Sequence, residues 1–256
     1  MDNVPRLRFR TTYHLLLTNQ TWYSINPGGY KIQFIDIATE RTTAVTDIFL
    51  GLLAFSIALF IYALGRRLDV TKARIWSWAF GMLSAASFSG AVAHGIKMSG
   101  RMKCVIWQPI NLALGLTVTL FAAGVVYDMK GFKISRALLS GLVAIGVLFY
   151  VISVAVPGTF ALFLAYEAAA MVFALVVYTS LAVRGRLAGS GMMSAGILIS
   201  MIAAAIQASG SVRIQLIWEF DHNSVFHLIQ MAGIACMTLG LRAEFRSREV
   251  SHIQGG

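Results

Sequence analysis

Long runs of apolar residues, separated by short polar segments, dominate the chain. A helix needs about 20 mostly apolar residues to cross the hydrocarbon core of a bilayer, because each residue adds only about 1.5 Å to its length. The chain contains seven runs of this length, at residues 44–64, 75–95, 105–127, 137–156, 159–182, 191–210 and 222–241. The pattern predicts an all-α integral membrane protein, a bundle of seven transmembrane helices.

The segments between these runs are short, so consecutive helices are expected to be antiparallel neighbours within one domain, residues 44–241. Residues 1–43 interleave aromatic side chains with arginines, and we expect them to lie at the membrane interface. Residues 242–256 are polar and basic and are expected to form a tail. The sequence therefore predicts three parts, of which the middle one spans the membrane.

Composition supports a membrane location, because 57% of the residues are hydrophobic and only 12% are charged, against about 25% charged in soluble proteins. The net charge of +10 is unevenly distributed among the predicted loops. The loops at one end carry Lys97, Arg101, Lys103 and Arg213; those at the other end and the tail carry Arg66, Arg67, Lys72, Arg74, Lys130, Lys133, Arg136, Arg184, Arg186, Arg242, Arg246 and Arg248.

Basic loops usually face the cytoplasm, so this distribution predicts a cytoplasmic C-terminus and an N-terminus outside. The bias is smaller when the basic residues of segment 1–43 are counted. Topology and attraction to anionic lipids account for the basic loops. Membrane lipids are therefore expected partners, and nucleic acid is not.

Polar side chains within the predicted spans gather in the outer half of the bundle, whereas the inner half is almost wholly apolar. Polar groups are costly in hydrocarbon, so intramembrane ionisable residues indicate a functional site. Their common depth predicts an outward-facing polar cavity formed by the first, second, third, fifth and seventh spans. Its residues are Glu40, Asp47, Ser87, His94, Asn111, Glu167, His222, Asn223, His227 and Gln230.

The histidines in this set suggest a zinc site, because imidazole binds zinc well and a catalytic zinc has three protein ligands and a water. His94, His227 and either His222 or Asp47 are the candidate ligands, and Glu40 or Asp47 is the candidate base. His222 and His227 are five residues apart, which turns them about 140° from each other on a regular helix. His222 is a candidate ligand only if it lies in the loop before the helix.

These features resemble the CREST superfamily of seven-helix membrane proteins, which includes the alkaline ceramidases and the adiponectin-receptor-like proteins. The shared features are the acids Glu40 and Asp47 at the first span, Ser87 and Ser89 before His94, and the segment DHNSVFHLIQ that opens the seventh. The resemblance implies a zinc-dependent hydrolase of lipid amides or esters. It makes His94 and His227 ligands, Glu40 the acid of the first helix and Ser87 a candidate catalytic residue.

The sequence departs from the CREST pattern at three places. Gly90 stands where the family has a serine four residues before the helix-two histidine. Asn111 is the nearest counterpart of an aspartate in helix three, and Asn223 replaces the first of two histidines in helix seven. These departures affect residues that the hydrolase chemistry requires.

Two other classes of protein fit the same residues. The first is a non-enzymatic receptor, transporter or accessory subunit of a membrane complex, in which the cavity binds a ligand or the bundle packs against partner membrane subunits. The second is a haem protein with His94 and His227 as axial ligands. A zinc enzyme requires bound metal, a haem protein requires a Soret absorption band, and the non-enzymatic class requires neither.

Overall fold

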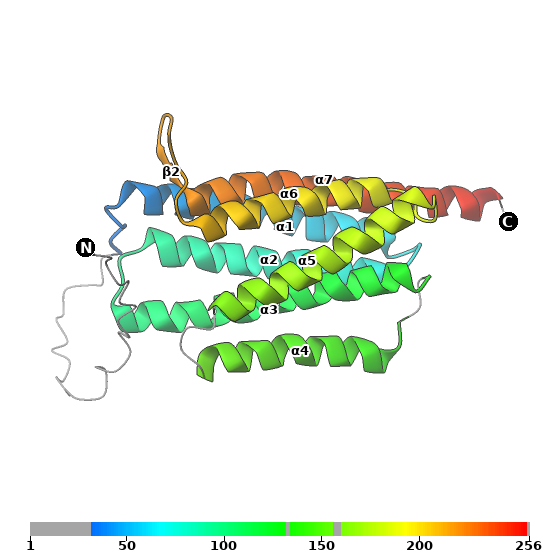
Figure 1. The fold of residues 1–256 in the computed structure, drawn as a ribbon, viewed down its shortest axis with the longest axis horizontal. Coiled ribbons are helices and arrows are strands. Elements are labelled where there is room, and N and C mark those ends of the chain that lie inside the picture. The colour runs from blue at the N-terminus through cyan, green and yellow to red at the C-terminus, as the bar shows by residue number, and fades with distance from the viewer. Residues whose placement is uncertain (1–31, 132–133, 156–159, 255–256) are drawn as a thin grey trace, which may run out of the picture. The chain divides into compact units, whose positions relative to one another are not determined.

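The computed structural model describes residues 32–131, 134–155 and 160–254, which form seven helices and one small hairpin (Figure 1). The prediction of seven helices is confirmed. The helices and strands, in chain order, are α1 (Ala38–Gly65), α2 (Val70–Gly95), α3 (Gly100–Met129), α4 (Arg136–Ala155), α5 (Phe160–Val183), α6 (Ser190–Ser209), β1 (Arg213–Gln215), β2 (Glu219–Asp221) and α7 (His222–Gln254).

Five helices of the described chain are long and apolar enough to cross a membrane. They are Ala38–Gly65, Gly100–Met129, Leu162–Val183, Ser190–Ser209 and His222–Ser251. Helix α4 is apolar over the shorter stretch Arg136–Ile152, and α2 is less apolar because it contains Lys72, Arg74 and several serines. The fold is therefore compatible with a multi-pass membrane protein.

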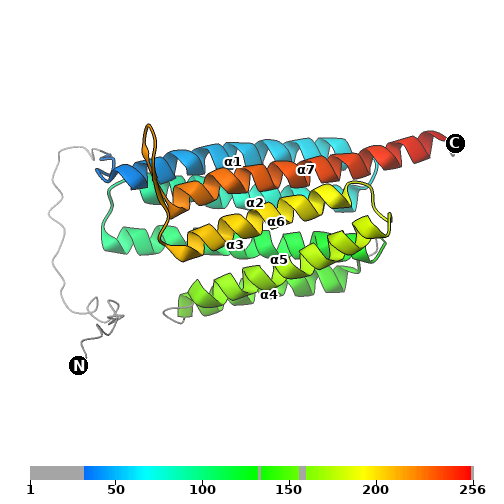
Figure 2. The same ribbon diagram turned by 45° about the horizontal axis from the view of Figure 1, so that its top comes forward.

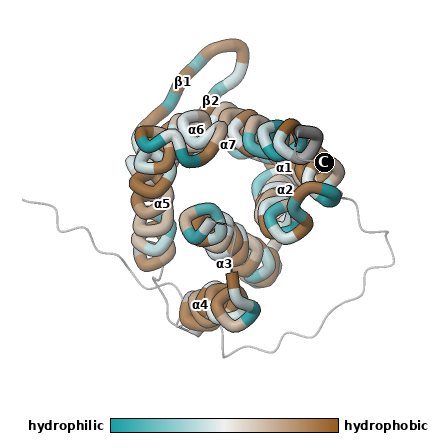
Figure 3. The backbone as a smooth tube through the Cα atoms, turned by 90° about the vertical axis from the view of Figure 1, so that its right-hand side faces the viewer, coloured by the Kyte–Doolittle hydropathy of each residue, from teal (hydrophilic) through white to brown (hydrophobic). Residues whose placement is uncertain are grey.

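The helices run alternately up and down the bundle (Figures 1 and 2). Helix α1 packs against α2 and α7, α2 against α3, and α6 against α7. Helix α5 packs against α6 and α3, while α4 packs mainly against α3 at the edge of the bundle (Figure 3). We call the end that contains β1 and β2 the hairpin end, and the opposite end, where α7 finishes, the C-terminal end.

Several boundaries differ from the predicted apolar runs. Helix α1 begins at Ala38, within the segment 1–43 that was expected at the membrane interface and of which residues 1–31 lie outside the described residues, and α2 and α3 each begin five residues before their predicted runs. Helix α7 continues to Gln254, so the segment expected to be a tail is helical over most of its length. The short strands β1 and β2 lie between α6 and α7, where a simple loop was expected. The search for apolar runs did not detect this extension, because the last turns of α7 are polar. A polar segment can still be helical when it lies outside a bilayer.

The main core lies between α1, α2, α3, α5, α6 and α7. Helix α1 contributes Leu50, Ile57 and Ile61, which recur at helical spacing and are almost fully buried. The opposite face of α1 is also apolar, since Phe55 and Leu59 are more than half exposed. A helix that is apolar on both its packed and its exposed faces is typical of contact with lipid.

Small residues bring α6 and α7 into close contact. A Cβ atom at Gly196 of α6 would lie 2.6 Å from the carbonyl oxygen of Gly233 in α7. A Cβ at Gly240 would lie 2.8 Å from the carbonyl oxygen of Gly189, just before α6. Small residues at such contacts let transmembrane helices approach closely, so dispersion forces act over more atoms.

Replacing Gly196 with alanine is expected to destabilise the bundle by about 1–3 kcal/mol, because the added methyl group would overlap the α7 backbone. The measurement is thermal unfolding of the purified protein in detergent. Gly191→Ala, in the same helix, is the matched control, because nothing lies within 4 Å of a Cβ at that position. Equal stability of the two variants would contradict this account of the α6–α7 contact.

Candidate functional site

Two helix ends meet at the hairpin end through Glu40 and His94. Glu40 lies in the first turn of α1, and His94 lies in the last turn of α2. The His94 Nδ1 atom is 2.6 Å from Glu40 Oε2, and both side chains are partly exposed. The ring of Trp107, from α3, packs edge-on against His94 with 5.8 Å between ring centroids.

A second histidine–acid contact lies about two helical turns deeper. His227 of α7 is 3.3 Å from Asp47 Oδ1 through its Nε2 atom, and its Nδ1 atom is 3.0 Å from Thr46 Oγ1. His227 and Asp47 are both buried. Gly90 of α2 packs directly over this pair, because a Cβ there would lie 2.8 Å from Asp47 Oδ2. The two histidines therefore contact two acids of the same helix, α1.

Asp221 caps α7 beside these pairs and was missed by the sequence reasoning. Its Oδ1 atom accepts hydrogen bonds from the Ser224 backbone N–H and hydroxyl, each at 2.9 Å, and from the Thr43 hydroxyl at 3.0 Å. Partial burial alone would raise the Asp221 pKa, but the hydrogen bonds from Ser224 and Thr43 outweigh it and hold the pKa below its ordinary value. The sequence signal is an aspartate three residues before a serine at a helix start.

Asp221→Ala is expected to destabilise the protein by about 1 kcal/mol, the usual cost of losing an N-cap, whereas Asp221→Asn keeps an acceptor and costs less. Because the folded pKa is depressed, the stabilisation from the carboxylate is complete at neutral pH. It is lost as the pH falls through the folded pKa. Thermal unfolding at neutral pH and in acid measures both effects. A stability of Asp221→Asn as low as that of Asp221→Ala would contradict the capping role.

The other predicted site residues do not take part in the two histidine–acid contacts. Asn223 accepts a hydrogen bond from Gln207 Nε2 at 3.3 Å, which joins α7 to α6. His222 is the first residue of α7, and its side chain makes no hydrogen bond or ion pair within the described chain. Four other predicted residues also make no side-chain hydrogen bond or ion pair within the described chain. Ser87 and Gln230 are buried, and Asn111 and Glu167 are partly buried.

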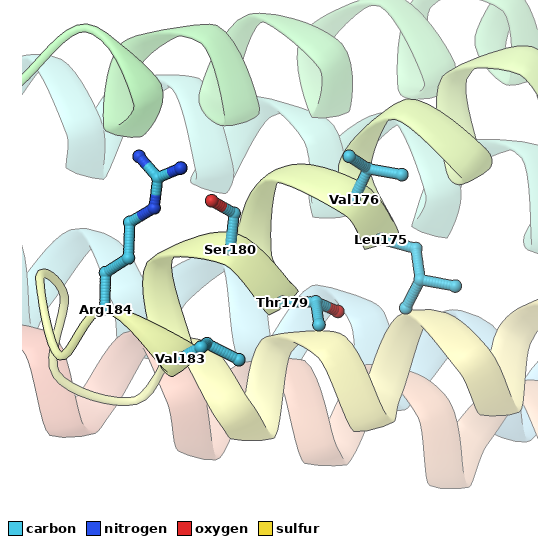
Figure 4. A pocket seen from close by; sticks show the side chains of 6 residues that line it. All are labelled: Leu175, Val176, Thr179, Ser180, Val183 and Arg184. Atoms are coloured by element: carbon cyan, nitrogen blue, oxygen red, sulfur yellow. The ribbon is translucent and has the colours of Figure 1, made fainter.

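A shallow groove of about 480 Å³ lies along the C-terminal half of α5 (Figure 4). Its lining contains none of the residues predicted for the outward polar cavity. The groove is lined by Leu175, Val176, Thr179, Ser180, Val183 and Arg184. The outward cavity itself stays a prediction.

The described histidines and acids at the hairpin end form two separate pairs, His94 with Glu40 and His227 with Asp47. In the described residues, no group of three or more His, Cys, Asp or Glu side chains is arranged so that it could hold a metal ion. His94 and His227 contact acids of α1, and both ring nitrogens of His227 already lie beside protein oxygens. Zinc binding stays a prediction.

The C-terminal end holds a cluster of buried charges around Lys72. The Lys72 Nζ atom is 2.8 Å from Asp128 Oδ1 and 3.1 Å from Glu244 Oε2. All three side chains are at most 4% exposed, and they come from α2, α3 and α7. The prediction that Lys72 lies in a loop is wrong, because Lys72 lies in the first turn of α2. Asp128 and Glu244 likewise lie in helices, just beyond the predicted apolar runs.

Four further side chains extend this charged cluster. Arg248 contacts Glu244 and is 2.9 Å from Asp69 Oδ2, and the Tyr127 hydroxyl donates to Asp69 at 2.9 Å. The Tyr178 hydroxyl, from α5, donates to Asp128 Oδ2 at 2.8 Å. The charged cluster therefore ties together α2, α3, α5 and α7.

Lys72→Met is expected to destabilise the protein by about 3–5 kcal/mol, because it removes the cation that contacts the buried Asp128 and leaves Glu244 with Arg248 alone. Arg74→Met is the matched control. Arg74 is exposed on the same helix, so the expected change is within about 0.5 kcal/mol. Chemical or thermal unfolding in detergent measures both, and a small effect of Lys72→Met would contradict the structural importance of the charged cluster.

Taken together, the chain is an all-α bundle in which five described helices have the length and composition of membrane spans. Residues 42–245 match DUF6962, a family of unknown function, and the chain belongs to this family. The matched range contains Asp47, His94, His227 and Lys72, whereas Glu40 precedes it. Comparisons with curated proteins and with solved structures gave no significant match.

Proposed function

We propose that this protein is a multi-pass integral membrane protein whose seven helices all cross the bilayer, with the hairpin end outside and the C-terminal end in the cytoplasm. The exposed basic side chains Arg66, Arg67, Arg184 and Arg186 at the C-terminal end support this orientation. Helix α2 is the least apolar span. Two of its serines, Ser77 and Ser84, donate to backbone carbonyls of α1.

We further propose a non-enzymatic role, as a receptor, transporter or accessory subunit that responds to protons at the hairpin end. The observation that supports this proposal is the pairing of both histidines with the acids of α1. Histidine is the side chain whose ordinary pKa lies nearest to neutral pH, and histidine–acid contacts between packed helices are suited to proton-linked switching.

A change in protonation would act on the packing of α1. Adding a proton to Glu40 or Asp47 removes the negative charge that faces the imidazole, and removing the imidazole proton weakens the same contact. Asp221 is the other acid near His227, while α3 contributes the neutral ring of Trp107. The links from α1 to α2 and from α1 to α7 would therefore weaken or strengthen together.

The arrangement favours this role over hydrolysis. A hydrolase needs room for a substrate beside its reacting groups. Here Asp47 and His227 are buried in contact with each other, and the α2 backbone at Gly90 packs directly on Asp47. A proton can reach such a closed site through small movements, whereas a lipid amide or ester requires an opening.

Spin labels on α1 and α7 test the proposal. Nitroxides are attached at Val45→Cys and Leu228→Cys, two exposed positions, in a protein whose Cys104 and Cys236 are replaced by serine. The interlabel distances are measured by double electron–electron resonance in nanodiscs between about pH 8 and about pH 4, a range wider than that of an ordinary histidine because His227 is buried. We expect the distance distribution to shift with pH.

The controls use the histidines of α7. His227→Gln is expected to abolish the pH-dependent shift, whereas His222→Gln is expected to retain it, because His222 contacts neither acid of α1. A distribution that does not change with pH would contradict the proton-linked role.

Metal content, measured by mass spectrometry on the same purified protein, decides between this role and the zinc hydrolase. About one zinc per chain, lost when His94 and His227 are both replaced by alanine, would overturn the non-enzymatic proposal.

A further inference from the structure

The hairpin between α6 and α7 ends in three exposed apolar side chains. Strands β1 and β2 are antiparallel, with Arg213 opposite Asp221 and Gln215 opposite Glu219. Leu216, Ile217 and Trp218 form the connecting turn, which we call the apolar tip, and they are 72%, 93% and 61% exposed. The Leu216 backbone N–H donates to the Trp218 carbonyl at 3.1 Å, which closes the turn.

The hairpin leaves the bundle sideways. Figures 1 and 2 show it projecting across the long axis of the helices, from the point where α6 ends and α7 begins. Both helices are long and apolar enough to cross a membrane. The end of a transmembrane helix lies at the level of the lipid headgroups, so a hairpin leaving sideways there runs along the interface.

The chemistry of the hairpin changes from base to tip in the way an interfacial segment requires. Four of the six strand residues are charged or amide side chains, and the other two are Ile214 and Phe220, whereas the turn is wholly apolar. Tryptophan is enriched at membrane–water interfaces, where its apolar ring enters the lipid and its N–H stays hydrated. Three adjacent apolar side chains in water would instead form an exposed apolar patch.

We propose that the apolar tip inserts into the boundary between headgroups and acyl chains of the leaflet at the hairpin end. The occupant of this surface is the phospholipid interface. This inference rests on the proposed membrane-spanning function, because only then do the ends of α6 and α7 define the depth of the hairpin.

Insertion would link the lipid interface to the histidine–acid site. Strand β2 packs against α1, and its last residue, Asp221, accepts a hydrogen bond from Thr43 of α1. The same Asp221 caps α7, the helix that carries His227. The three residues of β2 therefore connect the apolar tip to the contacts between α1 and α7 at the hairpin end.

The test uses an environment-sensitive NBD dye attached to a single cysteine in the full chain lacking Cys104 and Cys236. The protein is reconstituted into vesicles of phosphatidylcholine and phosphatidylglycerol. The test position is Ile217→Cys. Val176→Cys, exposed on the C-terminal half of α5, is the control for a lipid-facing site, and Ser251→Cys, exposed near the end of α7, is the control for water.

We expect the dye at Ile217 to emit at shorter wavelength than the dye at Ser251. It should lose most of its emission to lipids with a nitroxide near the headgroup and be protected from aqueous iodide. Emission and iodide quenching equal to those at Ser251 would overturn the insertion. Protection from iodide without quenching by nitroxide lipids would also overturn it, because a protein surface would then cover the tip.

The control at Val176 separates this inference from the proposed function. Lipid quenching at Val176 together with water exposure at Ile217 would overturn only the insertion of the tip. Water exposure at both positions would overturn the membrane-spanning arrangement itself.

Discussion

The arrangement of this bundle depends on the high free energy of a charge that lacks a partner in an apolar environment. In the described residues, the buried ionisable side chains therefore contact side chains of other helices: Lys72 contacts Asp128 and Glu244, and Asp47 contacts His227. These contacts specify which helices are neighbours more strictly than the apolar core does, because leucine and isoleucine pack acceptably against many surfaces.

The sequence predicts the helices well because length and hydropathy are local properties. Each predicted run lies within, or within one residue of, an observed helix. The end of α7 and the hairpin were missed for a physical reason. Polar turns such as those around Arg248 remain helical when tertiary contacts hold them, and strands of three residues are too short to show a period of two.

The candidate site could be predicted only in part. Grouping Glu40, Asp47, His94 and His227 at one end required only their depth along each span. Their pairing depends on the rotation of α2 and α7 against α1, which is a tertiary property. The Lys72 cluster was missed because each of its charges lies at the end of an apolar run, where a charge usually indicates a loop. Residue type alone is a poor guide to these contacts. His222 is a histidine in the first turn of α7, five residues before His227, yet it contacts neither acid of α1.

Helix α7 connects the two clusters. His227, Ile234, Leu241 and Arg248 recur every seven residues, so they lie along one face of the helix. The contacts at the C-terminal end are made by lysine, arginine and carboxylates, whose ordinary pKa values lie far from neutral pH. Those at the hairpin end involve histidine. Because one end of α7 is held by ion pairs to Lys72 and Asp69, a change in proton occupancy at the hairpin end would, under the proposed role, move the other end of α7, against α1 and beside the hairpin.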